Sequence, residues 1–377
     1  MCNCSLEQSL LQESSGKLRV RYTTSDDGKP VKQAEVYTQD EHGITRSHID
    51  RDALKVMRRL RESGHSAYVV GGAVRDLLLG KHPKDFDVAT DASPSRIRKL
   101  FRNSRVIGKR FRLVHIHFRN QHIIEVSTFR AKDSEGFHNV YGGIEEDVQR
   151  RDFTLNALYY DPEEQTVLDY VGGVRDIRSG RLRHVIPLER IFEEDPVRMI
   201  RAIKYATTSK FNMVSPLRRQ MKRSREALQD CSGSRLTEEV FKILLSGYAQ
   251  PIIRELLKYD MLPYILPQLD FLLQERSLGE FRENFFATLE DLDQLKETKE
   301  VTRAEAIAYL CGDFLFLISD FGKQRRVPFK EAFSEMKHFI RPVAPANRDV
   351  EQALVMLLRR RKRFLETGSL QPAQTKN

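Results

Sequence analysis

The sequence lacks any apolar run long enough to cross a membrane, and it does not begin with the apolar core of a signal peptide. It holds only four cysteines in 377 residues. Cys2 and Cys4 have no partners at zinc-like spacing, while Cys231 and Cys311 lie far apart in the chain. These absences exclude a disulfide framework and predict a protein of the reducing cytoplasm with no integral membrane segment. The absence of tryptophan excludes nothing.

Acidic residues are outnumbered overall and are missing from one long segment. The net charge of +10 and the pI near 9.4 favour a polyanionic partner, nucleic acid first and an anionic membrane second. No acidic residue occurs between Asp91 and Glu125. We interpret this basic block as a surface for RNA or nucleotide phosphates, although such a run can also be a solvated face. The phosphate-binding candidates in it are Arg96, Lys99, Lys109, Arg110 and Arg112.

The chain is too long for one compact core, and its apolar pattern changes near residue 185. Before that point we expect strands at 67–70, 86–89, 113–118, 122–129 and 167–171, with helices starting near Asp50, Ala73 and Ser93. Beyond it only helical spacing is found. The expected organisation is a flexible leader (1–46) with at most a short strand near 36–38, followed by a catalytic head (47–185) with a mobile loop at 131–149. A helical neck (186–250) that recognises the nucleotide base and a helical body and tail (251–377) that bind RNA are expected beyond it.

Asp85 and Asp87 are the pair around which we interpret the chain. In an extended strand they project to the same side, and two neighbouring carboxylates repel each other unless a cation lies between them. Mg²⁺ prefers such oxygen ligands and usually shares itself with substrate phosphates. Gly71 and Gly72 precede a helix and would offer N–H groups to those phosphates. Taken alone, the pair could equally be two surface aspartates in a solvated turn.

Two further polar positions interrupt apolar patterns. Glu125 lies inside the run 122–129, either as a third carboxylate of the site or as an edge-strand residue facing water. Asp195 precedes Pro196, which is typical of a helix N-cap. Asp195 and Arg198 are three residues apart, so they could instead pair on one helix face and present a planar set of donors and acceptors to a nucleobase. Spacing alone leaves both interpretations open.

Five motifs resemble, in order and spacing, those of the class II nucleotidyltransferases, the family of bacterial poly(A) polymerases and CCA-adding tRNA nucleotidyltransferases. They are Gly71-Gly72-Ala73-Val74-Arg75-Asp76, Asp85-Phe86-Asp87, Glu125-Val126-Ser127-Thr128-Phe129-Arg130, Arg150-Arg151-Asp152-Phe153-Thr154-Leu155-Asn156 and Glu194-Asp195-Pro196-Val197-Arg198. The resemblance covers residues 47 to 250 or so and thins beyond. It implies an α+β fold, with a polymerase-β-like head built on a mixed sheet and an all-helical neck, body and tail.

The resemblance also implies roles for single residues. Asp85 and Asp87 would bind two Mg²⁺ ions, Glu125 would complete the carboxylate set, and Asp152 would belong to the active site while fixing the head–neck junction. ATP would be the substrate. The implied nucleotide-binding residues are Gly71, Gly72 and Arg75 at the triphosphate, Glu194, Asp195 and Arg198 at the base, and Lys84, Arg130, Asn156 and Arg201 elsewhere in the site.

Residues 106–116 favour one branch of the family. CCA-adding members usually carry a Gly-Thr-Val-like strand here, whereas this segment resembles the one that marks the bacterial poly(A) polymerases, as do residues 37–44. We therefore expect template-independent addition of AMP to RNA 3′ ends, which promotes RNA decay. The chain ends soon after Arg363, without the basic extension usual in that branch, and this favours the alternative of a CCA-adding enzyme acting on tRNA. A non-catalytic RNA-binding protein is a remote third alternative, since the residues of the metal site are all present.

Overall fold

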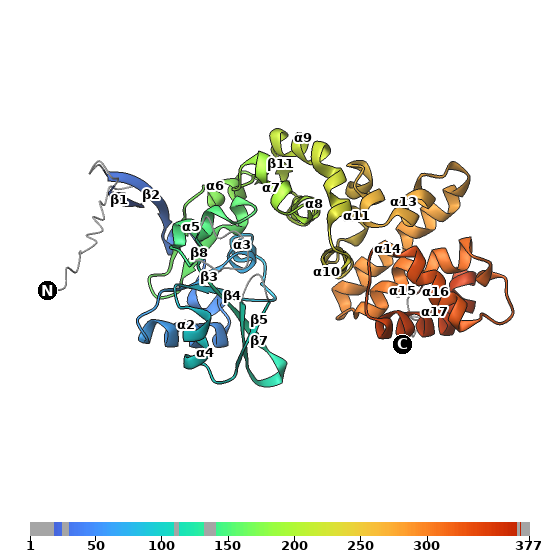
Figure 1. Cartoon of the computed structure of the whole chain (residues 1–377), viewed down its shortest axis with the longest axis horizontal. Coiled ribbons are helices and arrows are strands. Elements are labelled where there is room, and N and C mark those ends of the chain that lie inside the picture. Colours follow the sequence, from blue (N-terminus) through green and yellow to red (C-terminus); the bar gives the residue numbers. More distant parts are fainter. Residues whose placement is uncertain (1–18, 25–29, 109–112, 132–140, 368–369, 371–377) are drawn as a thin grey trace. The chain divides into compact units, whose positions relative to one another are not determined.

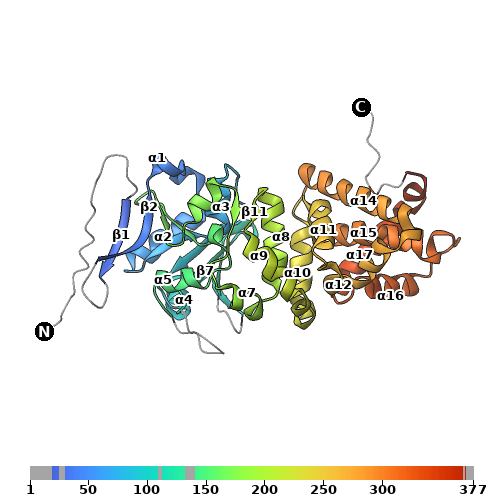
Figure 2. The same ribbon diagram turned by 90° about the horizontal axis from the view of Figure 1, so that it is seen from above.

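The computed structural model describes residues 19–24, 30–108, 113–131, 141–367 and 370. The chain forms two compact units, residues 1–187 and residues 188–377. The first unit contains a large mixed sheet with helices, and the second is helical apart from the two-residue strand β11 (Asn212–Met213), as Figures 1 and 2 show. The expected α+β class is confirmed.

The sheet of the first unit has nine strands in its described part, in the order β1-β2-β9-β8-β3-β4-β7-β6-β5. Only β4 and β7 run parallel, and every other neighbouring pair is antiparallel. The strands are β1 (Arg19–Thr24), β2 (Pro30–Tyr37), β3 (Ala67–Val70), β4 (Asp87–Thr90), β5 (Ser104–Ile107), β6 (Leu113–His117), β7 (Ile123–Thr128), β8 (Leu158–Asp161) and β9 (Thr166–Asp169).

The helices of both units begin where the sequence offers caps and apolar spacing. Asp50 caps α2 by accepting hydrogen bonds from the N–H groups of Asp52 and Ala53, at 2.8 and 2.9 Å. The helices of the first unit are α1 (Gln39–His42), α2 (Arg51–Glu62), α3 (Gly72–Leu78), α4 (Pro94–Leu100), α5 (Ile144–Gln149) and α6 (Gly173–Arg178).

The second unit continues as a run of helices. They are α7 (Leu188–Glu194), α8 (Val197–Ser209), α9 (Ser215–Ser224), α10 (Gly233–Leu244), α11 (Ala249–Lys258), α12 (Leu262–Ile265), α13 (Pro267–Gln274), α14 (Gly279–Thr298), α15 (Arg303–Asp313), α16 (Phe329–Phe339) and α17 (Asn347–Thr367). Among the described helices of the chain, none combines the length and the apolar character that a membrane crossing requires.

The two faces of the sheet differ. On one face Val88, Val126 and Val114 are register partners and fully buried. The helices α2 and α4 pack here: α2 contacts β3, β4 and β7, and α4 contacts β5 and β6. The side chain of Thr128, two residues after Val126, donates to the carbonyl of Ala92 at the entry to α4, at 2.7 Å. Figure 1 shows α2 and α4 together on one side of the head, apart from α3, α5 and α6.

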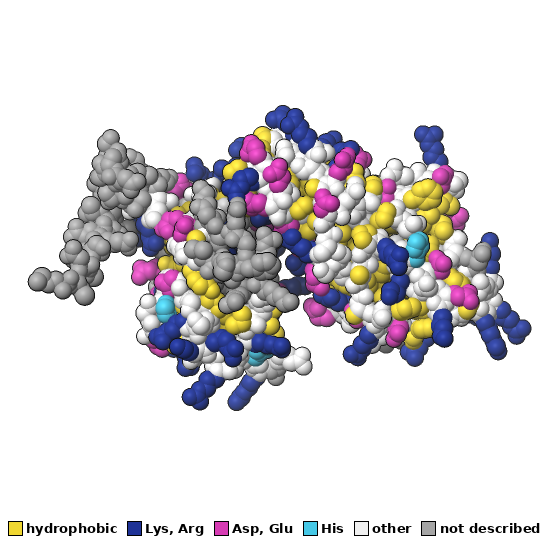
Figure 3. Space-filling model, in the orientation of Figure 1, with side chains coloured by type: hydrophobic (Ala, Val, Ile, Leu, Met, Phe, Trp, Pro, Cys, Tyr) yellow, Lys and Arg dark blue, Asp and Glu magenta, His cyan; other side chains and the backbone are white. Residues whose placement is uncertain are grey.

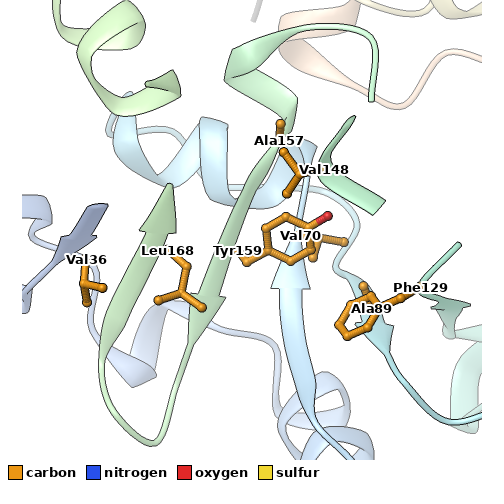
Figure 4. Close-up of a cluster of buried hydrophobic side chains, with 8 residues drawn as sticks. All are labelled: Val36, Val70, Ala89, Phe129, Val148, Ala157, Tyr159 and Leu168. Carbon is orange, nitrogen blue, oxygen red and sulfur yellow. The ribbon is translucent and has the colours of Figure 1, made fainter. Parts of the chain in front are cut away.

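The other face is apolar only over part of its width. Val36, Leu168, Tyr159 and Val70 follow one another in register across β2, β9, β8 and β3. They form a buried cluster that Val148 of α5 also joins, as Figure 4 shows. The same row continues into β4, β7, β6 and β5, where polar residues replace apolar ones, and this polar half of the face becomes the candidate site.

Two expectations about irregular segments need correction. Residues 19–24 and 30–37 are not a flexible leader but the strands β1 and β2, because β2 pairs with β9 and buries Val36 against Leu168. Residues 144–149 are not a loop but the helix α5, whose Gly143 N–H is capped by Glu146 at 2.9 Å. Residues 1–18 and 132–140 lie outside the described residues. Both strands and helix are stabilised by partners distant in sequence, which local periodicity does not reveal.

The second unit buries one carboxylate without compensation. Asp313, at the end of α15, is fully buried, and neither of its carboxylate oxygens has a hydrogen-bond partner among the described residues. Burial raises the pKa of Asp313 to about 7, and the nearby hydroxyl of Thr288 offsets this only in part. The raised pKa means that folding opposes ionisation, so this residue destabilises the protein progressively as the pH rises from about 4 to about 7.

Replacing Asp313 by asparagine is therefore expected to increase the free energy of unfolding by about 2–4 kcal/mol at pH 8, and to have little effect near pH 4. The measurement is urea denaturation at a series of pH values. Glu297→Gln, which neutralises an exposed carboxylate on α14, is the matched control and should leave stability unchanged at every pH. An Asp313→Asn protein that is less stable at pH 8 than the wild type contradicts the prediction.

Candidate active site

A row of polar residues crosses four neighbouring strands on the open face of the sheet. Asp87, the first residue of β4, is the register partner of Val70. It lies level with Glu125, since the residues that follow these two are partners in the parallel pair of β4 and β7. Glu125 pairs with His115 of β6, and His115 pairs with Arg105 of β5. Residues in one such row point to the same face, here the face away from α2 and α4.

Three carboxylates converge at the inner end of this row. The surrounding protein, followed by the charges of Glu125 and Asp85, raises the pKa of Asp87 to about 6, while Arg151 and His115 oppose the rise. Asp87 nevertheless keeps solvent contact, because its residue surface is exposed. Asp85 is also exposed and precedes the strand instead of belonging to it, which corrects the expectation that both aspartates lie within one strand. Asp85 and Asp87 nevertheless remain close enough for the charge of Asp85 to raise the pKa of Asp87.

His115 orients the third carboxylate. Its Nε2 lies 3.1 Å from Oε2 of Glu125, and both side chains are only partly buried. The contact holds the Glu125 carboxylate in one position on the open face of the sheet. Glu125 thus faces a histidine and other carboxylates, unlike an isolated edge-strand glutamate, and this arrangement favours the first of its two interpretations.

The carboxylates suit a hard divalent cation. Asp85 and Asp87 supply only oxygen donors, and the raised pKa of Asp87 records a repulsion that a cation would relieve. The three carboxylates do not form a closed cage. Among the described residues, a group of three acidic or histidine side chains with all ligand atoms within 4.8 Å of one another is found instead at Asp50, Asp52 and His122. That group is explained by helix capping and by the Lys55–Asp52 and His122–Asp52 contacts.

The glycine turn lies against the end of the Arg150–Asn156 segment. Gly71 follows β3 with φ +68° and ψ −125°, a conformation that other residues adopt only with strain. A side chain at Gly71 would meet Nη1 of Arg151 at 3.4 Å and the carbonyl oxygen of Asn156 at 3.8 Å. Glycine is therefore favoured here by its backbone conformation, since both distances are ordinary van der Waals contacts.

A chain of hydrogen bonds joins three of the predicted residues. Nη1 of Arg75, on α3, donates to Oδ1 of Asn156 at 2.9 Å, and Nδ2 of Asn156 donates to Oδ1 of Asp152 at 3.2 Å. Nε of Arg75 also donates to Asp76 at 2.9 Å. Asp152 and Asn156 are buried. The structure thus brings together residues from the first and the fourth motif, 77 and more positions apart in the chain.

Arg151 is a residue whose importance spacing did not indicate. Its Nη2 donates to Oδ2 of Asp147 at 3.0 Å, its Nε donates to the hydroxyl of Tyr159 at 2.9 Å, and its Nη1 donates to the carbonyl of Asn156 at 3.1 Å. The Tyr159 hydroxyl donates in turn to Asp147 at 2.6 Å. Arg151 also favours the charged form of Asp87. In the sequence, only its position next to Asp152 in the fourth motif indicated that Arg151 could belong to the site.

The remaining residues predicted for the first unit are dispersed. Lys84 is exposed directly before Asp85. Arg130 follows β7, pairs in a β-bridge with Tyr141, and has a pKa that burial lowers. Arg96 and Lys99 are exposed on α4, so they lie on the face opposite the carboxylate row and apart from the candidate site. The predicted residues Lys109, Arg110 and Arg112 lie outside the described residues.

The predicted side-chain pair of Asp195 and Arg198 does not form in the second unit. Arg198 donates instead to Oε2 of Glu194 at 3.0 Å and to the carbonyl of Ile191 at 2.9 Å. These contacts fasten the first turn of α8 to the last turn of α7. The two helices are consecutive, so Glu194 lies within reach on the turn before.

Asp195 has partners of its own. Its Oδ1 accepts from the N–H of Val197 at 3.2 Å, the capping role that Pro196 indicated, and its Oδ2 is paired with Arg235 of α10. The planar carboxylate–guanidinium pair therefore exists between Asp195 and Arg235, a residue that spacing could not supply. Arg201 lies one turn beyond Arg198 and contacts the Tyr205 hydroxyl at 3.3 Å.

Comparison with known protein families matches two segments. Residues 67–183 match the model described as the poly A polymerase head domain. Residues 210–273 match the model described as the probable RNA and SrmB-binding site of polymerase A. The first match covers β3 to β10 (Arg181–Leu182), and so includes the carboxylate row, the glycine turn and the Arg150–Asn156 segment.

Curated relatives and solved structures agree with these matches. The chain is 43% identical to poly(A) polymerase I of Escherichia coli O6:H1 over 251 residues, which is 62% of this chain and 54% of the relative. It is 35% identical to the CC-adding tRNA nucleotidyltransferase of Halalkalibacterium halodurans over 198 residues, 52% of this chain and 49% of the relative. The chain thus spans about half the length of these relatives. The Bacillus stearothermophilus CCA-adding enzyme in complex with CTP superposes with a TM-score of 0.56 at 25% identity, over 85% of this chain and 83% of that one.

Proposed function

Because this chain belongs to the class II nucleotidyltransferase family, we propose that it adds AMP from ATP to RNA 3′ ends without a template, in the cytoplasm, on mRNA and other transcripts. The observation that carries this proposal is the convergence of Asp85, Asp87 and Glu125 on the open face of the sheet. The Gly71 turn and the anchored Arg75 supply a phosphate site in the same unit.

In the proposed reaction the RNA 3′-oxygen attacks the α-phosphorus of ATP, its proton is lost, and the bond to pyrophosphate breaks. Asp85 and Asp87 would hold two magnesium ions, with Glu125 beside them. When bound, these ions activate the 3′-hydroxyl and neutralise the departing pyrophosphate. His115 orients Glu125 through their 3.1 Å contact. The chain's contribution is thus to hold charged groups in position for an in-line displacement.

The triphosphate and the base would be bound by residues that are already oriented. Arg75 is held between Asp76 and Asn156, and so presents a fixed guanidinium beside the glycine turn. In the second unit, we propose that Glu194 with Arg198, and Asp195 with Arg235, form the base-reading groups. These paired charges lose little freedom on binding, which favours selectivity for one base.

CCA addition to tRNA is the second candidate function. It is supported by the likeness to CCA-adding enzymes, while polyadenylation is supported by the higher identity to a poly(A) polymerase I, 43% against 35%. The segment 106–116 also favours polyadenylation. Its described residues belong to the paired strands β5 and β6, on which Arg105 and His115 extend the carboxylate row.

One assay separates these functions. The protein is incubated with Mg²⁺, a short unstructured RNA and each nucleoside triphosphate separately, and then with tRNA that lacks its 3′ CCA. Long ladders formed with ATP alone are the expected result. Growth by at most three nucleotides with a requirement for CTP supports the CCA alternative. If no nucleotide is added to either RNA, both enzymatic proposals fail.

A further inference from the structure

The outward sides of α2 and α4 carry positive charge that the site described above does not use. Both helices bury their apolar residues against the sheet, for example Val56 and Ile97. Figure 3 shows lysine and arginine side chains gathered over this part of the head. We define the basic outer surface as the exposed cations of these two helices together with Arg102, two residues beyond α4. They are Arg51, Lys55, Arg58, Arg59, Arg96, Arg98, Lys99 and Arg102.

Neighbouring acids neutralise only part of this surface. Asp52 pairs with Lys55 at 2.7 Å and with His122 at 3.2 Å. Asp91 pairs with His65 at 3.0 Å. Within the described part of the chain, Arg58, Arg98 and Arg102 make no ion pair. The only acid left on the outward side of α2 is Glu62, so the charges of both helices act on a common polyanion.

The helices are held as one rigid unit. The guanidinium of Arg59, on α2, lies 5.4 Å from the ring centre of Phe101 at the end of α4. Both helices pack on strands of the same sheet. The helices therefore hold the cations at fixed relative positions. Binding of a polyanion would cost little conformational entropy for ordering the backbone that carries them.

The chemistry of the surface distinguishes nucleic acid from a membrane. A helix that lies on a membrane needs large apolar side chains next to its cations. None of the exposed large hydrophobic residues in the described chain lies on α2 or α4. Cations without apolar anchors or stacking aromatics are typical of binding to phosphate groups irrespective of sequence.

The positive charge also connects this surface to the carboxylate row. Arg105 is exposed at the outer end of the row, on the edge strand β5. β5 contacts α4, and Arg102 lies only three residues before Arg105. Since neighbouring strands are about 4.8 Å apart, Arg105 lies roughly 14 Å from β4 across the sheet. An RNA strand whose 3′ end lies at Asp87 can thus follow cations over this edge of the sheet to α4 and α2.

We propose that the basic outer surface binds the phosphate backbone of RNA upstream of the 3′ end that is being extended. The proposal deepens the function proposed above and rests on it for the direction of the strand. It assigns the cations of α2 and α4 to RNA binding on the face of the sheet opposite the carboxylate row, where they lengthen the RNA site beyond the reacting nucleotide. The partner is a single RNA strand of any sequence.

The test uses the full chain with three arginines replaced, Arg58→Gln, Arg98→Gln and Arg102→Gln. RNA affinity is measured without ATP on oligonucleotides of about 6 and about 24 nucleotides, at several salt concentrations. The dissociation constant for the long RNA is expected to rise about tenfold or more. The slope of log affinity against log salt is expected to fall by about 2, since each lost contact to single-stranded RNA removes about 0.7. Affinity for the short RNA, and AMP addition to it, should not change.

A matched triple variant removes the same charge elsewhere, Arg325→Gln, Arg326→Gln and Arg348→Gln, all exposed in the second unit. Equal weakening by both triple variants, or an unchanged salt slope, overturns the proposal. It is also overturned if the first variant loses binding to phosphatidylglycerol vesicles and not to RNA. Arg58→Gln and Arg102→Gln are also made singly, and each is expected to change the slope by about 0.7. These single variants still test the proposal if the triple variant does not fold. Absent AMP addition by the wild type contradicts the proposed function alone, because the binding measurements need no catalysis.

Discussion

Under the proposed function, replacing Asp87 by asparagine is expected to reduce AMP addition by roughly 10³-fold or more, because the cations that would stabilise the transition state would lose a ligand. The fold should not suffer. Asp87 is exposed, and the surrounding protein, followed by the charges of Glu125 and Asp85, raises its pKa to about 6. Asparagine relieves the repulsion from these two charges, so the melting temperature is expected to stay the same or rise. Asp85→Ala should likewise lose nucleotide addition and retain RNA binding.

These variants are checked by primer extension with ATP and Mg²⁺, by thermal melting and by RNA binding without nucleotide. Glu164→Gln, in the turn between β8 and β9, is the control for removal of an exposed carboxylate and should keep full activity. Activity near the wild-type value in the Asp85 or Asp87 variant would refute the metal role. A loss of activity accompanied by a lower melting temperature would show instead that the aspartates serve the fold.

Replacing Arg151 by methionine is expected to lower the free energy of unfolding by about 3 kcal/mol, since it leaves the Asp147 carboxylate without its cation in a largely buried site. Tyr159, fully buried, also loses a hydrogen-bond donor. Nucleotide addition should fall as well, because Arg151 supports both the Asn156 backbone and the charged form of Asp87.

Urea denaturation of Arg151→Met, Asp147→Asn, their double variant and a control tests this result. Arg181→Met removes an exposed arginine from the same unit and should change stability by less than about 0.5 kcal/mol. The double variant Arg151→Met, Asp147→Asn should recover part of the lost stability, because the uncompensated charge is removed with its partner. If the double variant is as unstable as the sum of the two single variants, the buried charge is not the cause of the destabilisation.

The sequence correctly predicted those helices and strands whose formation depends on residues close together in the chain. The helix α2 is set by the Asp50 cap and by its apolar spacing, and α4 begins at Ser93 and Pro94 as expected. The strands β3, β4, β6 and β7 also lie where alternation and turn residues predicted them. Asp87 and Glu125 proved to share one face, as the period of a strand requires.

Features that depend on distant partners were not predicted. β2 is a strand because β9, some 130 positions later, pairs with it. Arg96 and Lys99 lie on α4, on the face of the sheet opposite the carboxylates, so their closeness in sequence to the aspartates did not mean closeness in space. Asp195 pairs with Arg235, forty positions away, and not with Arg198.

The sequence by itself therefore determined which residue types are available for the proposed chemistry: carboxylates at Asp85, Asp87 and Glu125, a glycine turn at Gly71, and an excess of arginine and lysine. Residue type and short-range spacing carry that information. Only the tertiary structure decided how these groups are combined. Register across the sheet places His115 and Arg105 in the carboxylate row, buried hydrogen bonds join Arg151 to Tyr159, and the order of the strands sends the basic helices to the opposite face. Those arrangements arise from pairing between segments far apart in the chain, where local propensity carries no information.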